Sequence, residues 1–138
     1  MNWDTFSMDI ANAQRGILIT SPYLHIAQVK RFLKLLPKDV RLTVVTGDET
    51  SYKLEAWEKV SNAVNLLEDN GATVILQPKV YQRYAVIDNR FLWYGGINFL
   101  GFEKVTHGAM RLCSAELAKE LQDRCGTGQE TQMKLAEI

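Results

Sequence analysis

The sequence has little cysteine, no long apolar run and no excess of charge of either sign. Only two of its 138 residues are cysteine, Cys113 and Cys125, and neither has a histidine or cysteine partner at the spacing of a zinc site. We therefore expect two reduced, semi-buried thiols, as in proteins of a reducing compartment. No metal ion and no other cofactor is predicted.

The apolar runs are all short. None approaches the ~20 residues that a helix needs to cross a bilayer. The first ten residues, MNWDTFSMDI, lack the basic start and the apolar core of a signal peptide. These absences predict a cytoplasmic protein that does not bind membranes.

The charges balance, since 16 basic and 16 acidic side chains give a formal net charge of zero. This balance argues against a protein that binds nucleic acid through its overall charge, but it allows a local basic patch. The densest basic stretch contains Lys30, Arg31, Lys34, Lys38 and Arg41. We interpret it as a solvated helix face; the alternative is a surface that follows a phosphate backbone.

The chain does have a regular alternation of helical and extended patterns. Apolar residues make up 46% of it and charged residues 23%, which is typical of a globular protein. Apolar residues three and four apart predict helices, and short apolar or β-branched runs predict strands. Helices are expected at 4–14, 26–36, 52–69 and from Ser114 to Gly126, and strands at 16–20, 40–47, 72–77, 84–88, 91–95 and 109–113.

This order of elements indicates an α/β fold, with a mixed sheet sandwiched by helices and strand 16–20 near its centre. Residues 1–126 are expected to form one domain, and 127–138 a tail or helical extension. In the long helix, Ser51 or Thr50 is expected to cap the start. Leu54 and Trp57 should begin the buried stripe of that helix, and Asn70-Gly71 should end it.

One stretch, YQRYAVIDNRFLWYGGINFL at residues 81–100, carries an ordered spacing of polar residues and glycines. Tyr81 and Arg83 are followed after four residues by Asp88, and after six more by Gly95-Gly96-Ile97-Asn98. This spacing resembles the His-x-Lys-x4-Asp-x6-Gly-Ser-x-Asn motif of the phospholipase D superfamily, especially the domains found in nucleases and attached to helicases. The segments SPYL, VRLTVVTG and GATVILQP resemble that family too. The resemblance covers about residues 8–124, one repeat of the family.

The resemblance implies a role for each position. In the family, the histidine attacks phosphorus, the lysine, serine and asparagine bind phosphate oxygens, and the aspartate secures the hairpin. The resemblance therefore implies phosphate binding by Arg83, Gly95, Gly96 and Asn98, and a structural role for Asp88. Arginine suits phosphate because its planar fork donates two hydrogen bonds at once. Gly96 lacks the serine hydroxyl, and residues 106–112 lack the carboxylate that the family usually places there.

Tyr81 stands at the nucleophile position, and this exchange decides the chemistry that we expect. A phenol with a pKa of about 10 is almost entirely un-ionised at neutral pH, and it is a poor substitute for imidazole as nucleophile or acid. We therefore assign no catalytic residue, and we expect Tyr81 to fill the space of the histidine. The alternative is that Tyr81 is itself a nucleophile assisted by Arg83.

Two histidines are candidates for the lining of the same cleft. His25 follows SPYL at the end of a strand, where α/β folds bind ligands. His107 lies near the position of the missing carboxylate. Neither has a partner nearby in the sequence, and His25 is explained more simply as a residue at a helix start.

The predicted function is that of a catalytically degenerate phospholipase D-like domain, a pseudoenzyme. It keeps a cleft for the phosphate of nucleic acid or another phosphodiester, and serves as a docking module of a DNA-processing protein of the helicase or nuclease type. Because the chain holds one motif, a homodimer or a second repeat is expected. Two alternatives stay open: a phosphodiesterase or nuclease of which this is the inactive half, and a structural dimerisation module.

Overall fold

The computed structural model describes residues 3–95, 100 and 110–123, within which six strands form one sheet. The strands are β1 (Gly16–Thr20), β2 (Arg41–Gly47), β3 (Thr73–Gln77), β4 (Tyr84–Ile87), β5 (Phe91–Tyr94) and β6 (Met110–Cys113). Their order across the sheet is β3-β2-β1-β4-β5-β6. The pairs β1–β2 and β2–β3 are parallel and the other three are antiparallel. The predicted mixed sheet is confirmed.

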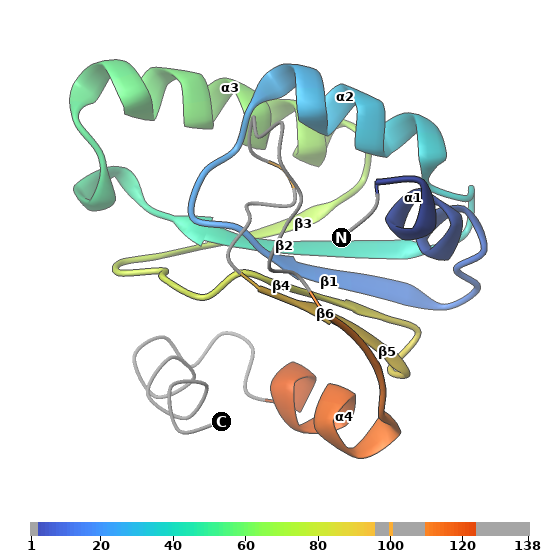
Figure 1. Cartoon of the computed structure of the whole chain (residues 1–138). Coiled ribbons are helices and arrows are strands. Elements are labelled where there is room, and N and C mark those ends of the chain that lie inside the picture. The colour runs from blue at the N-terminus through green and yellow to red at the C-terminus, as the bar shows by residue number, and fades with distance from the viewer. Residues whose placement is uncertain (1–2, 96–99, 101–109, 124–138) are drawn as a thin grey trace.

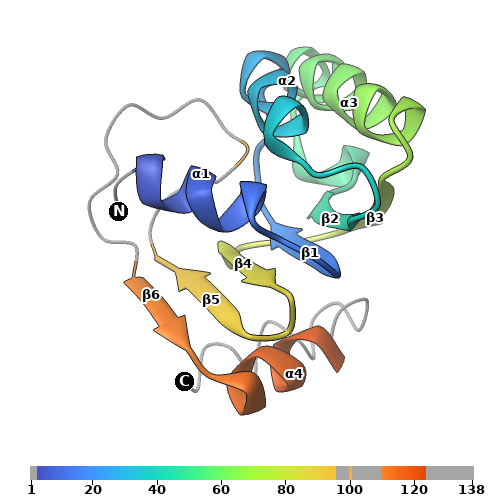
Figure 2. The ribbon, with the colours of Figure 1, turned by 90° about the vertical axis from the view of Figure 1, so that its right-hand side faces the viewer.

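Helices lie on both faces of this sheet (Figure 1). They are α1 (Trp3–Ala11), α2 (Ile26–Leu35), α3 (Leu54–Asp69) and α4 (Ala115–Asp123). The first three cover one face, and α4 packs against β4 and β5 on the other (Figure 2). The α/β class with a sheet between helices is therefore confirmed.

The core has two parts because side chains alternate between the faces of a strand. Ile17 and Ile19 of β1 point to the α1–α3 side, where they join Phe6, Phe32 and other buried side chains. Leu18 points to the other side, with residues of α4. Burying a side chain of this size stabilises the fold by about 1.5–3 kcal/mol. The continuous apolar run of β1 follows from this burial on both faces.

The β4–β5 hairpin is fastened to the start of β1 by Asp88. Asp88 and Asn89 have φ of 56° and 55°, the left-handed conformation that tight hairpin turns require and that Asp and Asn adopt most readily after glycine. The Asp88 carboxylate accepts hydrogen bonds from the backbone amides of Gln14, Arg15 and Gly16 at 2.7–3.2 Å. One side chain thus holds two segments that are distant in sequence.

Asp9 fastens α1 to the far strands of the sheet. Its carboxylate accepts hydrogen bonds from Trp93 Nε1 at 2.7 Å and from Arg111 Nε at 2.6 Å. The hydrogen bond to Asp9 raises the pKa of the Arg111 guanidinium above its usual value. Trp93 is 3% exposed and belongs to the buried core on the α1–α3 side of the sheet.

The start of α3 differs from the prediction. The helix begins at Leu54 after Lys53, which makes no side-chain capping bond, and the side chain of Leu54 is 74% exposed. The expected cap at Thr50 or Ser51 is wrong, because these residues lie in a separate 3₁₀ turn capped by Asp48. Tyr52 is extended with φ −132°, so the helix cannot start there.

The predicted end of α3 and the predicted start of α4 are confirmed. Gly71 has φ 88° just after α3, as a left-handed helix stop requires. Ser114 Oγ accepts a hydrogen bond from the Leu117 amide at 3.2 Å and so caps α4. Cys113 is a free thiol, but it is exposed rather than semi-buried because β6 is an edge strand. Cys125 and the predicted tail lie outside the described residues.

The basic stretch lies only partly on a helix. Lys30, Arg31 and Lys34 are exposed residues of α2, whereas Lys38 lies beyond its end in a turn.

Over the ranges that the structure describes, no helix is long and apolar enough to cross a membrane. Nor do the same ranges bring three or more His, Cys, Asp or Glu side chains together as metal ligands.

Candidate phosphate-binding cleft

A cleft of about 410 Å³ lies at the edge of the sheet where the three parallel strands end. Pro22 follows β1, Gly47 ends β2, and Pro78 and Lys79 follow β3. In open α/β sheets, ligands bind at this edge. The cleft therefore occupies the position that the fold provides for a ligand.

Tyr81 and Arg83 enter the cleft from the segment that precedes β4. Tyr81 is 68% exposed and Arg83 is half-buried, and both line the cleft. Gln82 between them is held: its carbonyl accepts a hydrogen bond from Thr20 Oγ1 at 3.0 Å, and its Oε1 accepts one from the Tyr94 hydroxyl at 2.7 Å. This anchoring fixes where the two cleft residues stand.

Gly95 lies beside Arg83 because β4 and β5 are antiparallel. The end of β5 therefore meets the start of β4, and the Gly95 amide donates a hydrogen bond to the Arg83 carbonyl at 3.4 Å. The structure thus brings Tyr81, Arg83 and Gly95 to one edge of the sheet. Gly96, Asn98 and His107 lie outside the described residues.

Lys79 has φ 58°, a conformation that residues other than glycine rarely adopt. It costs roughly 1–2 kcal/mol relative to ordinary backbone. This residue turns the chain after β3, and Lys79, Val80, Tyr81 and Arg83 then line the cleft. Strain of this kind is often found at binding sites.

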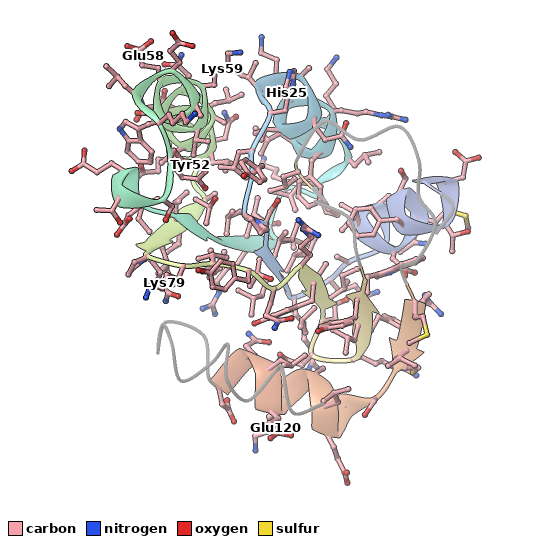
Figure 3. All side chains as sticks on the ribbon, turned by 60° about the vertical axis from the view of Figure 1, so that its left-hand side comes forward. His25, Tyr52, Glu58, Lys59, Lys79 and Glu120 are labelled. Atoms are coloured by element: carbon pink, nitrogen blue, oxygen red, sulfur yellow. The ribbon has the colours of Figure 1, made fainter. Side chains whose placement is uncertain are left out.

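Tyr52, like Tyr23 and Lys79, lines the cleft although the sequence did not predict it there. Its hydroxyl donates a hydrogen bond to the Pro22 carbonyl and lies 3.4 Å from Thr46 Oγ1. Burial raises the pKa of the Tyr52 phenol above its usual value. Figure 3 shows Tyr52 pointing from the segment before α3 toward the strand ends, on the same side of the molecule as Lys79.

Three aromatic rings form a row beside the cleft. Tyr23 and Tyr52 meet with ring centroids 5.8 Å apart at 64°, and Tyr52 stacks on Trp57 at 6.0 Å. Gly47 leaves the room for Tyr52, because a Cβ atom at Gly47 would lie 2.6 Å from the Tyr52 hydroxyl oxygen. In the sequence, the only indication that Tyr52 packs here is that a glycine, Gly47, ends a strand shortly before it.

His25 has a structural role in the described structure. It precedes α2, its Nδ1 accepts a hydrogen bond from the Ala27 amide at 3.2 Å, and its own amide donates to the Leu100 carbonyl at 2.8 Å. It is exposed at the helix start (Figure 3) and is not among the described residues that line the cleft.

Asp88 lies at the opposite edge of the sheet, since β4 runs from the cleft toward it.

The described residues that line the cleft supply two cations, Lys79 and Arg83, and several hydroxyl groups. The same part of the lining contains no histidine, aspartate or glutamate. Such a site attracts an anion. The described lining offers no imidazole or carboxylate to accept a proton at neutral pH.

Comparison with solved structures identifies the fold. Nuc from Salmonella typhimurium, a phospholipase D family member, matches with a TM-score of 0.67 at 14% identity, over 88% of this chain and 82% of that one. The chain has a phospholipase D-like fold. NucT from Helicobacter pylori matches with a TM-score of 0.70 at 12% identity, over 94% of this chain and 87% of that one.

The phospholipase D-like fold also matches part of TrmBL2, an archaeal chromatin protein whose structure shows a novel mode of DNA binding. The TM-score is 0.58 at 9% identity, over 87% of this chain and 45% of TrmBL2. No protein-family model matches the sequence, and the comparison with curated proteins finds no match. The likeness is therefore one of fold.

Proposed function

We propose that this phospholipase D-like domain binds the phosphate of a nucleic acid in its cleft and does not cleave it. The observation that carries the proposal is the composition of the cleft. Its described lining combines two cations with hydroxyl groups and contains no imidazole or carboxylate. Binding needs only the cations, whereas cleavage also needs a nucleophile and a proton acceptor.

Arg83 is the central phosphate ligand of the proposal. By motif spacing it takes the place of the family's lysine, and it stands half-buried in the cleft wall next to Gly95. A guanidinium binds two phosphate oxygens at once. The phosphate site of this proposal is completed by Gly95, Gly96 and Asn98. Asp88 stabilises the β4–β5 hairpin and does not contact the phosphate.

Tyr81 takes the place of the nucleophilic histidine by the same spacing. Its phenol would have to ionise to attack phosphorus, and the described lining supplies no base to take the proton. The domain is therefore proposed to be a pseudoenzyme. A second motif, from a homodimer or from another repeat of the same kind, would bring a second cleft alongside.

Nucleic acid is the proposed ligand because one protein of similar fold, TrmBL2, binds DNA. A nucleic acid also offers a row of phosphates to the cations of the cleft. The domain would then dock a DNA-processing protein of the helicase or nuclease type onto its substrate.

The experiment measures binding of labelled single-stranded and duplex DNA by fluorescence anisotropy at two salt concentrations. It uses the wild type, Arg83→Ala and the matched control Arg90→Ala, an exposed arginine at the hairpin turn. Arg83→Ala should weaken binding by about tenfold or more and lower the salt slope by about one. Arg90→Ala should change neither.

Three results would overturn the proposal. Absence of binding at low salt would remove the phosphate site, and equal losses at both arginines would place the ligand elsewhere. Metal-free cleavage of the strand that is lost in Tyr81→Phe would instead show that Tyr81 is a nucleophile.

A further inference from the structure

Two tyrosine rings stand exposed in the cleft. Tyr23 is 53% exposed and Tyr81 is 68% exposed, and both line the same cleft as Lys79 and Arg83. Exposed aromatic rings beside cations in a groove are the combination with which proteins bind unpaired bases. The phosphate site alone does not explain the rings.

Tyr23 is held in place before any ligand arrives. Ser21 Oγ donates a hydrogen bond to the Tyr23 carbonyl at 2.6 Å, and the next residue, Leu24, is 4% exposed. The Tyr23 ring also packs against Tyr52, which is itself bonded to the Pro22 carbonyl. A ring on so fixed a backbone loses little conformational freedom on binding.

Tyr81 is held from both sides as well. Val80 before it is 7% exposed, and Gln82 after it is bonded through its backbone and its side chain to Thr20 and Tyr94. The two exposed rings therefore occupy defined places on the cleft wall. Arg83 follows Tyr81 by two residues and lines the same cleft.

We infer that Tyr23 and Tyr81 form a base-binding subsite beside the phosphate site, and that the ligand is single-stranded nucleic acid. Unpaired bases stack on the two rings while Arg83 binds the neighbouring phosphate. This inference rests on the proposed function, because it uses the same cleft. In a duplex the base faces are hidden in the stack, so a duplex offers phosphates but nothing for the tyrosines.

The test compares an oligothymidylate strand, an abasic strand of the same length and a duplex. Each is titrated into the full chain as wild type, Tyr23→Ala, Tyr81→Ala, Tyr23→Phe, Tyr81→Phe and Arg83→Ala. The alanine variants should weaken oligothymidylate binding about tenfold, and the phenylalanine variants, which keep the ring, should bind like the wild type. All four tyrosine variants should leave binding of the abasic strand and the duplex unchanged, and Arg83→Ala should weaken binding of every strand.

The outcomes separate the two proposals. If the tyrosine variants bind oligothymidylate normally while Arg83→Ala does not, the base subsite is refuted and the phosphate site stands. If no strand binds, both are refuted. Repeating the titration with oligouridylate shows whether DNA or RNA supplies the base, and a tenfold loss with either strand supports the subsite.

A fluorescence measurement gives a second readout. In Tyr23→Trp and Tyr81→Trp variants, stacking of a base should quench the new indole when oligothymidylate is added. The abasic strand should bind without this quenching. Equal quenching by both strands would contradict stacking.

Discussion

Tyr52 donates a hydrogen bond to the backbone carbonyl of Pro22, thirty residues earlier in the sequence. This contact joins the segment before α3 to the turn after β1, and both segments line the cleft. Because the Tyr52 ring also contacts Tyr23, the bond fixes an exposed cleft residue through a half-buried one.

The raised pKa of Tyr52 predicts a loss of stability at alkaline pH. Burial is the main cause of the shift. As the pH rises, the phenol of Tyr52 therefore loses its proton at a higher pH in the folded state than in the unfolded state. The contribution to stability is complete below pH ~10, the unfolded value, and falls as the pH rises through the higher folded value. The free energy of unfolding of Tyr52→Phe should decline less steeply over this alkaline range.

Gly47→Ala should displace Tyr52, because the added Cβ would lie 2.6 Å from the Tyr52 hydroxyl oxygen and 2.9 Å from Cζ. We expect a loss of roughly 1–3 kcal/mol in the free energy of unfolding, measured by chemical denaturation. Gly16→Ala is the matched control, since the nearest atom to its Cβ would be 3.6 Å away. A loss at Gly16 equal to that at Gly47 would contradict the steric explanation.

Lys79→Gly should separate stability from binding. Glycine adopts the φ of 58° at this position without steric cost, so the variant should be at least as stable as the wild type. Its affinity for a nucleic acid should fall, because a cation of the cleft is lost. Lys79→Ala should lose the same affinity without gaining stability, and full affinity in both variants would exclude Lys79 from the phosphate site.

Asp88→Asn should destabilise the fold by about 1–3 kcal/mol, because a neutral amide accepts fewer and weaker hydrogen bonds from the three amides at the start of β1. Asp39→Asn, at an exposed turn residue, should be close to neutral. The folded fraction of Asp88→Asn should still bind oligonucleotide like the wild type, since Asp88 lies at the opposite edge of the sheet. Denaturation curves and binding isotherms on the same samples test both expectations.

Local periodicity predicts most of the fold because each strand and helix has a buried side. The runs of β1 and β2, the glycine stop at Gly71 and the cap at Ser114 all follow from interactions within a few residues. The motif spacing further places Tyr81 and Arg83 at one sheet edge with Gly95. These features depend on local sequence and on strand direction.

What the sequence does not predict depends on contacts between distant segments. Tyr52 lies outside α3 and donates a hydrogen bond to the distant Pro22 carbonyl, and the helix begins only at Leu54. The need for glycine at position 47 comes from the same ring. No pattern within a short window contains these three-dimensional contacts.

The cleft is proposed to bind a phosphodiester without cleaving it. The most direct measurement is an amide NMR correlation spectrum of isotopically labelled protein, recorded as oligothymidylate is added without metal, with the strand length checked afterwards. Shifts are expected at the amides of Gly47, Lys79, Arg83 and Gly95, with few shifts at Asn89 and Arg90 on the opposite edge, and the strand should stay intact. Shifts confined to the opposite edge would show that the cleft does not bind the strand, and a shortened strand would show that the domain cleaves it.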